Sequence, residues 1–260
     1  MPSYIKGSIR SLLIISFMSS YSLAMEIKNL SQAVDVAGKQ RMFTQRMLKD
    51  YAMVGLENNF GNPGEDLHKI MGAFEDHLDS LILFNTEENT ETSLLKVKDM
   101  WAAVKVSLQD APKKENAGKM QEDLEALLKQ SNEAVGLFAK QTGKVSGKII
   151  NISGRQRMLS QRMASLYMLK VWKVNDQKFQ EKMNKTMDLF KTSLKTLMDS
   201  ELNTPETTSL LKKAKKSFMF FEMMNKSSSK FIPTLIYKKS NDILKDMNTA
   251  TGLYAIEASK

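Results

Sequence analysis

Two arginines occupy equivalent positions in a pair of closely similar sequence stretches. Arg41 lies in AGKQRMFTQRM (37–47) and Arg157 lies in SGRQRMLSQRM (153–163), and seven of the eleven positions are identical. An arginine side chain presents a planar fork of N–H donors that matches a planar oxyanion. Each arginine follows a glycine, Gly38 or Gly154, by three residues, and a glycine lets a second helix approach closely. The pattern therefore predicts a site for a small anion.

Polar side chains accompany each arginine on one face of the helix that contains it, here called the signature helix. At 100° per residue, Arg41 falls on a seam with spacing like that of a coiled coil, at a position where an apolar residue is usual. Thr44 and Gln45, with Ser160 and Gln161 in the second stretch, lie one turn further along. The predicted anion-binding residues are therefore Arg41, Arg157, Gly38, Gly154, Thr44, Ser160, Gln45 and Gln161.

A simpler interpretation is that each arginine reaches water or pairs with a carboxylate on a neighbouring helix. If the two helices meet, guanidinium groups about 7 Å apart repel by about 2 kcal/mol at an effective dielectric constant of about 20. A planar monoanion between them would reverse this repulsion, and nitrate and nitrite have that shape and charge. Arg46 and Arg162 lie off the seam, so we predict that they are surface or supporting groups without a direct ligand role.

The two stretches belong to an internal repeat with an offset of 116 residues. The same offset aligns residues 92–95 (TSLL) with 208–211, and we place a change to an offset of 109 further on, where Ser131-Asn132 meets Ser240-Asn241. Turn signals divide each copy into four amphipathic helices, and short loops between such helices predict an antiparallel four-helix bundle. The predicted helices are 27–58, 65–84, 90–109 and 116–142, then 145–174, 177–200, 205–225 and 231–257. We therefore predict an all-α fold with modules at 25–142 and 143–260.

The connection between the modules decides whether the two arginines can meet within one chain. A turn at 141–147 would set the signature helices parallel, so that Arg41 faces Arg157. The segment can instead stay helical, because its two glycines cost only about 2 kcal/mol in a long helix. It contains no proline and keeps its apolar spacing, so we predict two bundles joined end to end through a shared helix. In that arrangement a shared anion site requires a homodimer.

The first 24 residues have the features of a secretory signal peptide. Lys6 and Arg10 precede a short apolar core at 12–18, and small residues follow at 22–24. Cleavage after Ala24 would lower the formal charge from +9 to +7 and leave a periplasmic chain without a membrane anchor, since no later segment supplies about 20 apolar residues. Lysines spread along the chain indicate a solvated surface, and export argues against nucleic acid as a partner.

The sequence gives little support for catalysis or for a metal. The absence of cysteine excludes disulfides and thiolate metal sites. Helical bundles can hold di-iron centres with paired Glu-x-x-His motifs, but the sequence has one such string, Glu65 to His68, and the second copy contains no histidine. The many methionines are predicted to be flexible core filling. We therefore predict a protein that is not an enzyme and that has no catalytic residues, metal site or cofactor.

The stretches GKQRMFTQRM and GRQRMLSQRM resemble the signature helix of a periplasmic sensor domain. That domain is shared by the nitrate/nitrite sensor kinases NarX and NarQ and the type IV pilus chemotaxis transducer PilJ. The motif is most similar to the PilJ version. The nitrate sensors that the motif resembles are homodimers whose first helices face each other and bind one nitrate with an arginine from each subunit. That arginine follows the motif glycine by three residues, which corresponds here to Arg41 and Arg157.

The resemblance implies a periplasmic binding protein for a small, nitrate-like or nitrite-like anion. The sequence carries no kinase, HAMP or methyl-accepting region, so a separate membrane receptor or sensor kinase would have to pass on the signal. The alternative is a ligand-free helical adaptor or structural protein that pairs with a chemotaxis or sensor-kinase receptor. There the arginines would bond a partner's carboxylate or helix carbonyls. The two readings differ in whether the arginine seams are exposed or face each other.

Overall fold

Eight helices form the regular structure of the part of the chain that the computed structural model describes, residues 25–143, 145–174, 177–226 and 232–258. They are α1 (Leu30–Gly55), α2 (Pro63–Phe84), α3 (Glu88–Gln109), α4 (Lys114–Gln141), α5 (Val145–Val171), α6 (Phe179–Met198), α7 (Pro205–Lys226) and α8 (Pro233–Glu257). The predicted all-α fold built of helical bundles is confirmed. The predicted signal peptide lies outside the described residues, and no helix within them is long and apolar enough to cross a membrane.

The predicted continuous helix between the two modules is wrong. α4 ends at Gln141, Gly143 has a φ of 60°, and α5 begins at Val145. The amide of Gly143 donates to the carbonyl oxygen of Lys140 at 3.1 Å, which closes the last turn of α4. A left-handed residue just after a helix is the usual place for glycine, because a side chain there meets steric cost. Gly143 is therefore a helix terminator, and the end-to-end rod is not formed.

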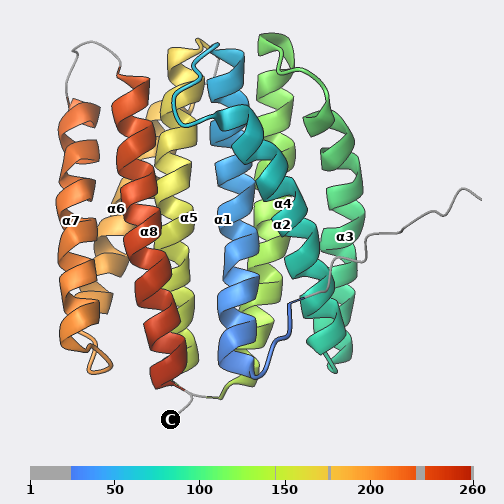
Figure 1. Cartoon of the computed structure of the whole chain (residues 1–260), viewed down its shortest axis with the longest axis vertical. Coiled ribbons are helices and arrows are strands. Elements are labelled where there is room, and N and C mark those ends of the chain that lie inside the picture. The colour runs from blue at the N-terminus through green and yellow to red at the C-terminus, as the bar shows by residue number, and fades with distance from the viewer. Residues whose placement is uncertain (1–24, 144, 175–176, 227–231, 259–260) are drawn as a thin grey trace, which may run out of the picture.

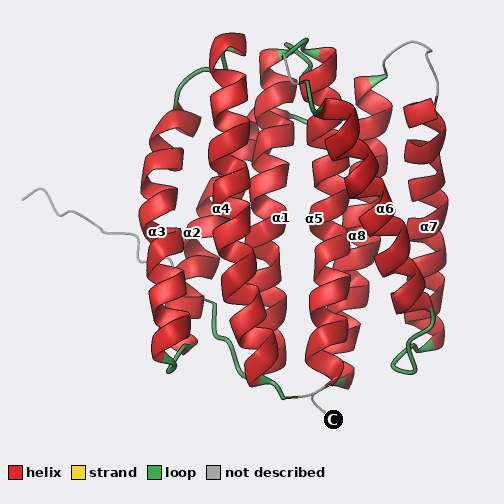
Figure 2. Cartoon of the chain, turned by 180° about the vertical axis from the view of Figure 1, so that it is seen from behind, coloured by secondary structure: helices red, strands yellow, loops and turns green. Residues whose placement is uncertain are grey.

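The two bundles lie side by side, with α1 and α5 parallel and in contact along the centre of the molecule (Figures 1 and 2). α4 and α8 flank this pair, and α3 and α7 lie at the two ends of the array. α2 crosses the face seen in Figure 1, and α6 crosses the opposite face, seen in Figure 2. Because α1 and α5 have neighbours on several sides, both the apolar stripe and the arginine seam of each helix are buried.

The structure corrects the repeat register in the second half of each copy. The buried positions of α4 recur in α8 at an offset of 116: Met120, Leu124, Leu127, Ala134 and Phe138 match Ile236, Ser240, Ile243, Ala250 and Tyr254. The predicted change to 109 is therefore wrong. A seven-residue slip keeps the same helical face, which is why a second alignment looked acceptable. In α3 and α7 the offset is 117, because Phe74 packs on Trp101 at 4.5 Å between ring centroids and Phe190 packs on Phe218 at 4.4 Å.

The side-by-side packing predicts an unequal response of two glycines to alanine. A Cβ atom at Gly55, at the end of α1, would lie 2.1 Å from Trp172, which follows α5, whereas a Cβ at Gly72 in α2 meets no heavy atom within 4 Å. Gly55→Ala is expected to lower the free energy of unfolding by about 1–3 kcal/mol, because the indole must move. Gly72→Ala is expected to raise it by about 0.5–1 kcal/mol, since alanine favours the helix. Thermal and denaturant unfolding would measure both, and equal effects would argue against the contact.

Candidate functional site

Arg41 and Arg157 meet in the centre of the α1–α5 interface, and both side chains are 0% exposed. A Cβ atom at Gly38 would lie 3.1 Å from Nη2 of Arg157 and 3.4 Å from Nη2 of Arg41, and the same two distances hold at Gly154. The Cβ position at Gly38 is also 4.0 Å from the Cα atom of Gly154. The two glycines thus mark the point of close helix approach, and the two guanidinium groups converge there within one chain.

Arg41 is held by hydrogen bonds from two different helices. Its Nη1 atom donates to Oδ1 of Asn132 on α4 at 2.8 Å, and its Nη2 atom donates to the backbone oxygen of Asn151 on α5 at 3.2 Å. The guanidinium group is therefore fixed by the fourth helix of its own repeat and by the signature helix of the other repeat. This geometry orients the group towards the repeat interface and not towards solvent.

Arg157 repeats this arrangement at an offset of 116 and adds a carboxylate. Its Nη1 atom donates to Oδ1 of Asn248 at 3.0 Å, and its Nη2 atom donates to the backbone oxygen of Asp35 at 3.1 Å. The Asp35 carboxylate also lies 2.7 Å from Nη1 of Arg157. The equivalent residue beside Arg41 is Asn151, which is neutral. The pseudosymmetric centre is therefore asymmetric in charge.

The pKa shifts at the centre agree with one paired and one unpaired arginine. Burial alone would raise the pKa of Asp35, but the charges of Arg157 and Lys39 lower it overall, so Asp35 is ionised at neutral pH. Burial, followed by the charges of Arg155 and Arg157, lowers the pKa of Arg41 to about 9. Arg41 still carries its proton at neutral pH, and it forms no ion pair among the described residues. The two guanidinium charges thus lie beside one carboxylate, which pairs with Arg157 and also with Lys39 at 3.4 Å.

Each arginine also keeps a buried donor without a protein acceptor. The Nε atoms of Arg41 and Arg157 are inaccessible to solvent and have no hydrogen-bond partner among the described residues. A guanidinium group has five N–H donors, and a buried donor left without an acceptor costs about 1–3 kcal/mol or more when it is charged. Small oxyanions are acceptors that suit donors of this kind.

The hydroxyl groups of Thr44 and Ser160 do not donate their hydrogen bonds towards the arginine pair. Thr44 Oγ1 donates to the carbonyl oxygen of Arg41 at 2.9 Å, and Ser160 Oγ donates to that of Arg157 at 2.8 Å. A serine or threonine that bonds back to its own helix is a common arrangement inside helices. Both hydroxyls therefore donate to the backbone of their own signature helix, although they lie beside the arginines in the sequence.

The two motif glutamines that follow the hydroxyl residues differ from each other. Gln45 accepts from Ser165 at 3.4 Å, and its buried Nε2 has no partner among the described residues. Gln161 accepts from Lys49 at 2.8 Å and donates to the backbone oxygen of Ser240 at 3.0 Å. The bonds of Gln161 thus connect it to a second polar cluster and not to the guanidinium groups.

Four residues that contact the arginines were missed by sequence reasoning, namely Asn132, Asn151, Asn248 and Asp35. The equivalence of Asn132 and Asn248 becomes visible once the 116-residue offset is kept through α4 and α8. The motif glutamines Gln40 and Gln156 were also overlooked. They donate to the backbone oxygens of Phe74 at 2.9 Å and Phe190 at 3.1 Å, and so tie each signature helix to the next helix of its repeat.

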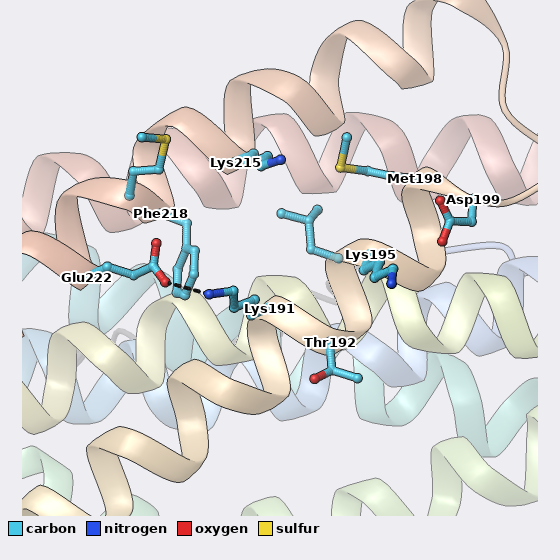
Figure 3. A pocket seen from close by; sticks show the side chains of 10 residues that line it. Lys191, Thr192, Lys195, Met198, Asp199, Lys215, Phe218 and Glu222 are labelled. Carbon is cyan, nitrogen blue, oxygen red and sulfur yellow. Dashed lines mark hydrogen bonds and ion pairs between the residues drawn. The ribbon is translucent and has the colours of Figure 1, made fainter.

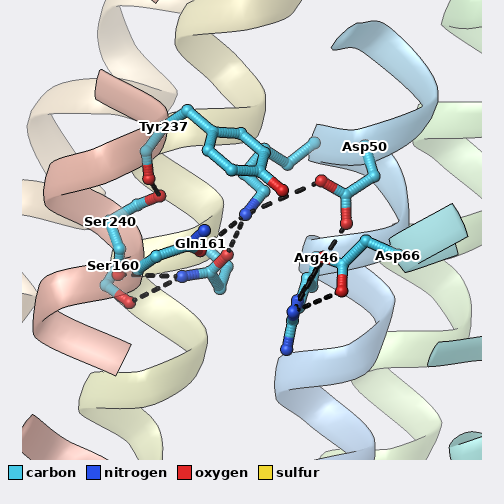
Figure 4. Close-up of polar contacts among 9 residues, drawn as sticks. Arg46, Asp50, Asp66, Ser160, Gln161, Tyr237 and Ser240 are labelled. Carbon is cyan, nitrogen blue, oxygen red and sulfur yellow. Dashed lines mark hydrogen bonds and ion pairs between the residues drawn. The ribbon is translucent and has the colours of Figure 1, made fainter. Parts of the chain in front are cut away.

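The second polar cluster surrounds Lys49, which is 0% exposed (Figure 4). Its Nζ atom donates to Gln161 and to Asn241, both at 2.8 Å, and lies 4.0 Å from the centroid of the Tyr237 ring. These contacts link α1 of the first repeat to α5 and α8 of the second. The second repeat carries Ser165 at the equivalent position, so the cluster occurs once.

Acidic residues complete this cluster on the side of α2. Burial raises the pKa of Asp50 to about 8 although Lys49 opposes the shift, and burial lowers the pKa of Lys49 to about 8. Arg46 binds Asp66 with both ends of its guanidinium group, at distances of 2.6 to 2.9 Å. Figure 4 shows Arg46 turned towards Asp66, away from Gln161. Arg162 pairs with Glu125 at 3.1 Å, so neither of these arginines enters the central pair.

The ion pair of Asp35 predicts a pH-dependent loss of stability on mutation. Asp35→Asn leaves the buried Arg157 without a carboxylate and is expected to lower the free energy of unfolding by about 2–4 kcal/mol at neutral pH. The pKa of Asp35 is lower in the folded state, so its contribution is present above the unfolded value and is lost as pH falls through the folded value. Denaturant unfolding between pH 7 and about pH 3 should therefore show the two proteins converging in acid. Asp188→Asn, at an exposed site on α6, is the control, and an equal loss there would refute the assignment.

Comparison with known families agrees with this architecture. The family model described as the N-terminal region of type IV pili methyl-accepting chemotaxis transducers matches residues 23–136 and again residues 138–216. The predicted resemblance to PilJ is confirmed, and the likeness to the nitrate sensor kinases stays a prediction. Searches among curated proteins and among solved structures gave no match. The chain belongs to the family of type IV pili methyl-accepting chemotaxis transducer N-terminal domains, whose pattern it carries twice.

Proposed function

We propose that the protein is a periplasmic sensor-type binding protein for a small planar monoanion such as nitrate or nitrite. The family supports a sensory role. The observation that carries the ligand class is the convergence of two buried guanidinium groups at Gly38 and Gly154. The Nε atom of each group also has no hydrogen-bond partner among the described residues. A separate membrane receptor or sensor kinase is the proposed recipient of the signal. The periplasmic location rests on the predicted signal peptide.

The charge count at the centre favours a single negative charge on the ligand. Arg41 and Arg157 contribute two positive charges, and Asp35 removes one of them. A monoanion would neutralise the remainder, whereas sulfate would bring a second charge into a buried site at a high desolvation cost. A planar oxyanion can accept from two guanidinium forks in one plane, which chloride cannot do. We therefore expect nitrate or nitrite to bind in preference to chloride and sulfate.

The tandem arrangement supplies both halves of the proposed site in one molecule. The resemblance to the nitrate sensors implied one arginine from each subunit of a homodimer. Here α1 and α5 of a single chain bring both arginines together, so the site does not depend on a second copy. This supports a protein that binds its ligand as a monomer and presents the result to its partner.

A ligand-free adaptor is the alternative, and one observation favours it. Both arginines already donate to backbone carbonyls and asparagine side chains, which could give them a purely structural role. The adaptor alternative also requires the arginine-bearing faces of α1 and α5 to contact a partner protein. Both side chains are 0% exposed and converge on each other, so the geometry supports the anion site better.

Titration with nitrate, nitrite, chloride and sulfate, followed by calorimetry and thermal unfolding, tests the proposed function. Nitrate or nitrite is expected to stabilise the protein by RT ln(1 + [L]/Kd), about 2.7 kcal/mol at a concentration of 100 Kd. Arg41→Ala and Arg157→Ala should abolish this effect, and Lys129→Ala, at an exposed site on α4, should leave it unchanged. A wild-type protein that responds equally to all four anions would favour the ligand-free adaptor.

Asn151→Asp separates loss of the ligand from loss of the fold. It would place a carboxylate beside Arg41 at the position where Asp35 serves Arg157, so both guanidinium charges would be neutralised from within. The variant is expected to unfold at a higher temperature than the wild type and yet to bind nitrate at least about tenfold more weakly. The same titration measures both quantities. A stabilised variant that keeps wild-type affinity would show that the net charge of the centre does not select the ligand.

A further inference from the structure

The two ends of the helical array carry opposite charge. α2 and α3 together contain eight acidic residues and four lysines, a net charge of −4 with histidines neutral, whereas α6 and α7 contain nine lysines and four acidic residues, a net charge of +5. We call these the acidic edge and the basic edge. α3 and α7 lie at opposite ends of the array, and α2 and α6 pack on α1 and α5 across opposite faces (Figures 1 and 2). The repeat therefore has similar backbone shape at both ends but opposite electrostatic sign.

The sign of the side-chain charge reverses at equivalent positions of the repeat. Glu75 and Asp79 on α2 correspond, at the offset of 116, to Lys191 and Lys195 on α6. The pairing to the neighbouring helix reverses as well: Glu75 accepts from Lys105 on α3 at 2.6 Å, whereas Lys191 donates to Glu222 on α7 at 3.3 Å. The difference is thus a local exchange of charges and not only an average over long helices.

The basic edge contains an open groove between α6 and α7 (Figure 3). Its volume is about 710 Å³, and Leu194, Phe218 and Met219 are among its apolar lining residues. Lys195 and Lys215 line it too, and neither forms an ion pair with another described residue. Met219 is 59% exposed, and methionine adapts readily to an apolar partner. Asp199 and Glu222 line the groove as well, and Glu222 pairs with Lys191, so the three lysines leave a net charge of +1 beside the apolar side chains.

The acidic edge has complementary properties. Leu83, Leu95 and Val106 on α2 and α3 are 76%, 45% and 65% exposed. Asp79 on α2 and Asp99 on α3 are exposed, and Asp79 pairs with Lys98 at 3.2 Å. Exposed apolar side chains rimmed by charge are typical of protein–protein contact surfaces. The apolar and acidic side chains of the acidic edge are therefore complementary to the apolar and basic side chains of the basic edge on another copy.

We propose that copies of this protein associate head to tail, with the basic edge of one molecule seated on the acidic edge of the next. Two basic edges or two acidic edges repel each other, so charge selects the unlike pair. A contact between two different surfaces of the same chain is heterologous and generates a closed ring or an open filament. The residues that line the groove are not among those that bond Arg41 or Arg157, so this association does not rest on the proposed anion binding.

Sedimentation velocity and light scattering of the wild-type protein over a concentration series test the association directly. At about 20 mM NaCl the mass is expected to rise with concentration, and at about 500 mM NaCl the apparent affinity should fall at least about tenfold, because screening shortens from about 20 Å to about 4 Å. A wild-type protein that stays monomeric at every concentration in low salt would overturn the proposal and leave the basic groove to a different acidic partner.

A charge exchange gives the sharper test. Lys195→Glu with Lys215→Glu lowers the net charge of α6 and α7 from +5 to +1 and makes the groove lining acidic. Asp79→Lys with Asp99→Lys raises the net charge of α2 and α3 from −4 to 0. Each double variant alone is expected to be monomeric, and an equimolar mixture of the two should recover association. Lys129→Glu with Lys148→Glu, at exposed sites on α4 and α5, changes the net charge equally and should associate like the wild type. Circular dichroism verifies that all variants are folded. A mixture that stays monomeric, or a double variant that still self-associates, would place the contact elsewhere.

Discussion

Two like charges buried at the closest approach of α1 and α5 set the main constraint on this structure. The glycines that allow the approach also remove the side chains that would separate the guanidinium groups. The helices can stay together only if the charge is compensated, and the carboxylate of Asp35, the two asparagine oxygens and the backbone carbonyls supply part of that compensation. The flanking helices α4 and α8 are therefore tied to the centre electrostatically as well as by apolar packing. The remaining charge is what makes the centre a candidate site and not merely a structural junction.

The structure brings together the arginines and glycines that the sequence singled out, but by a different path of the chain than the one predicted. The periodic apolar residues and turn signals were enough to define eight helices, since helix formation is largely a local property. A turn at 141–147 was considered but not preferred, because a glycine inside a helix and a glycine that ends one look alike without knowledge of φ. The difference between them decides whether two bundles form a rod or a parallel pair.

The partners of the arginines could not be derived for a related reason. Asn132 and Asn248 are far from Arg41 and Arg157 along the chain, and their role depends on which faces of α4 and α8 turn towards the centre. A heptad slip preserves that face, so a weak alignment at 109 hid the stronger correspondence at 116. The hydroxyls of Thr44 and Ser160 donate to the carbonyl oxygens of Arg41 and Arg157 on their own helices, which their place in the sequence alone did not reveal. Which acceptor a hydroxyl group binds depends on the three-dimensional arrangement of the helix and not on residue type alone.

The covalent joining of the two repeats has a consequence for how the protein can evolve. In a homodimer every substitution appears twice, once on each side of the symmetry axis, so the two halves cannot acquire different properties. In this chain Asp35 has a neutral counterpart in Asn151, Lys49 has one in Ser165, and Glu75 has an oppositely charged one in Lys191. Fusion thus freed each half to change alone. The two halves of this pseudosymmetric fold can therefore be distinguished by their charges, whereas the halves of a homodimer cannot.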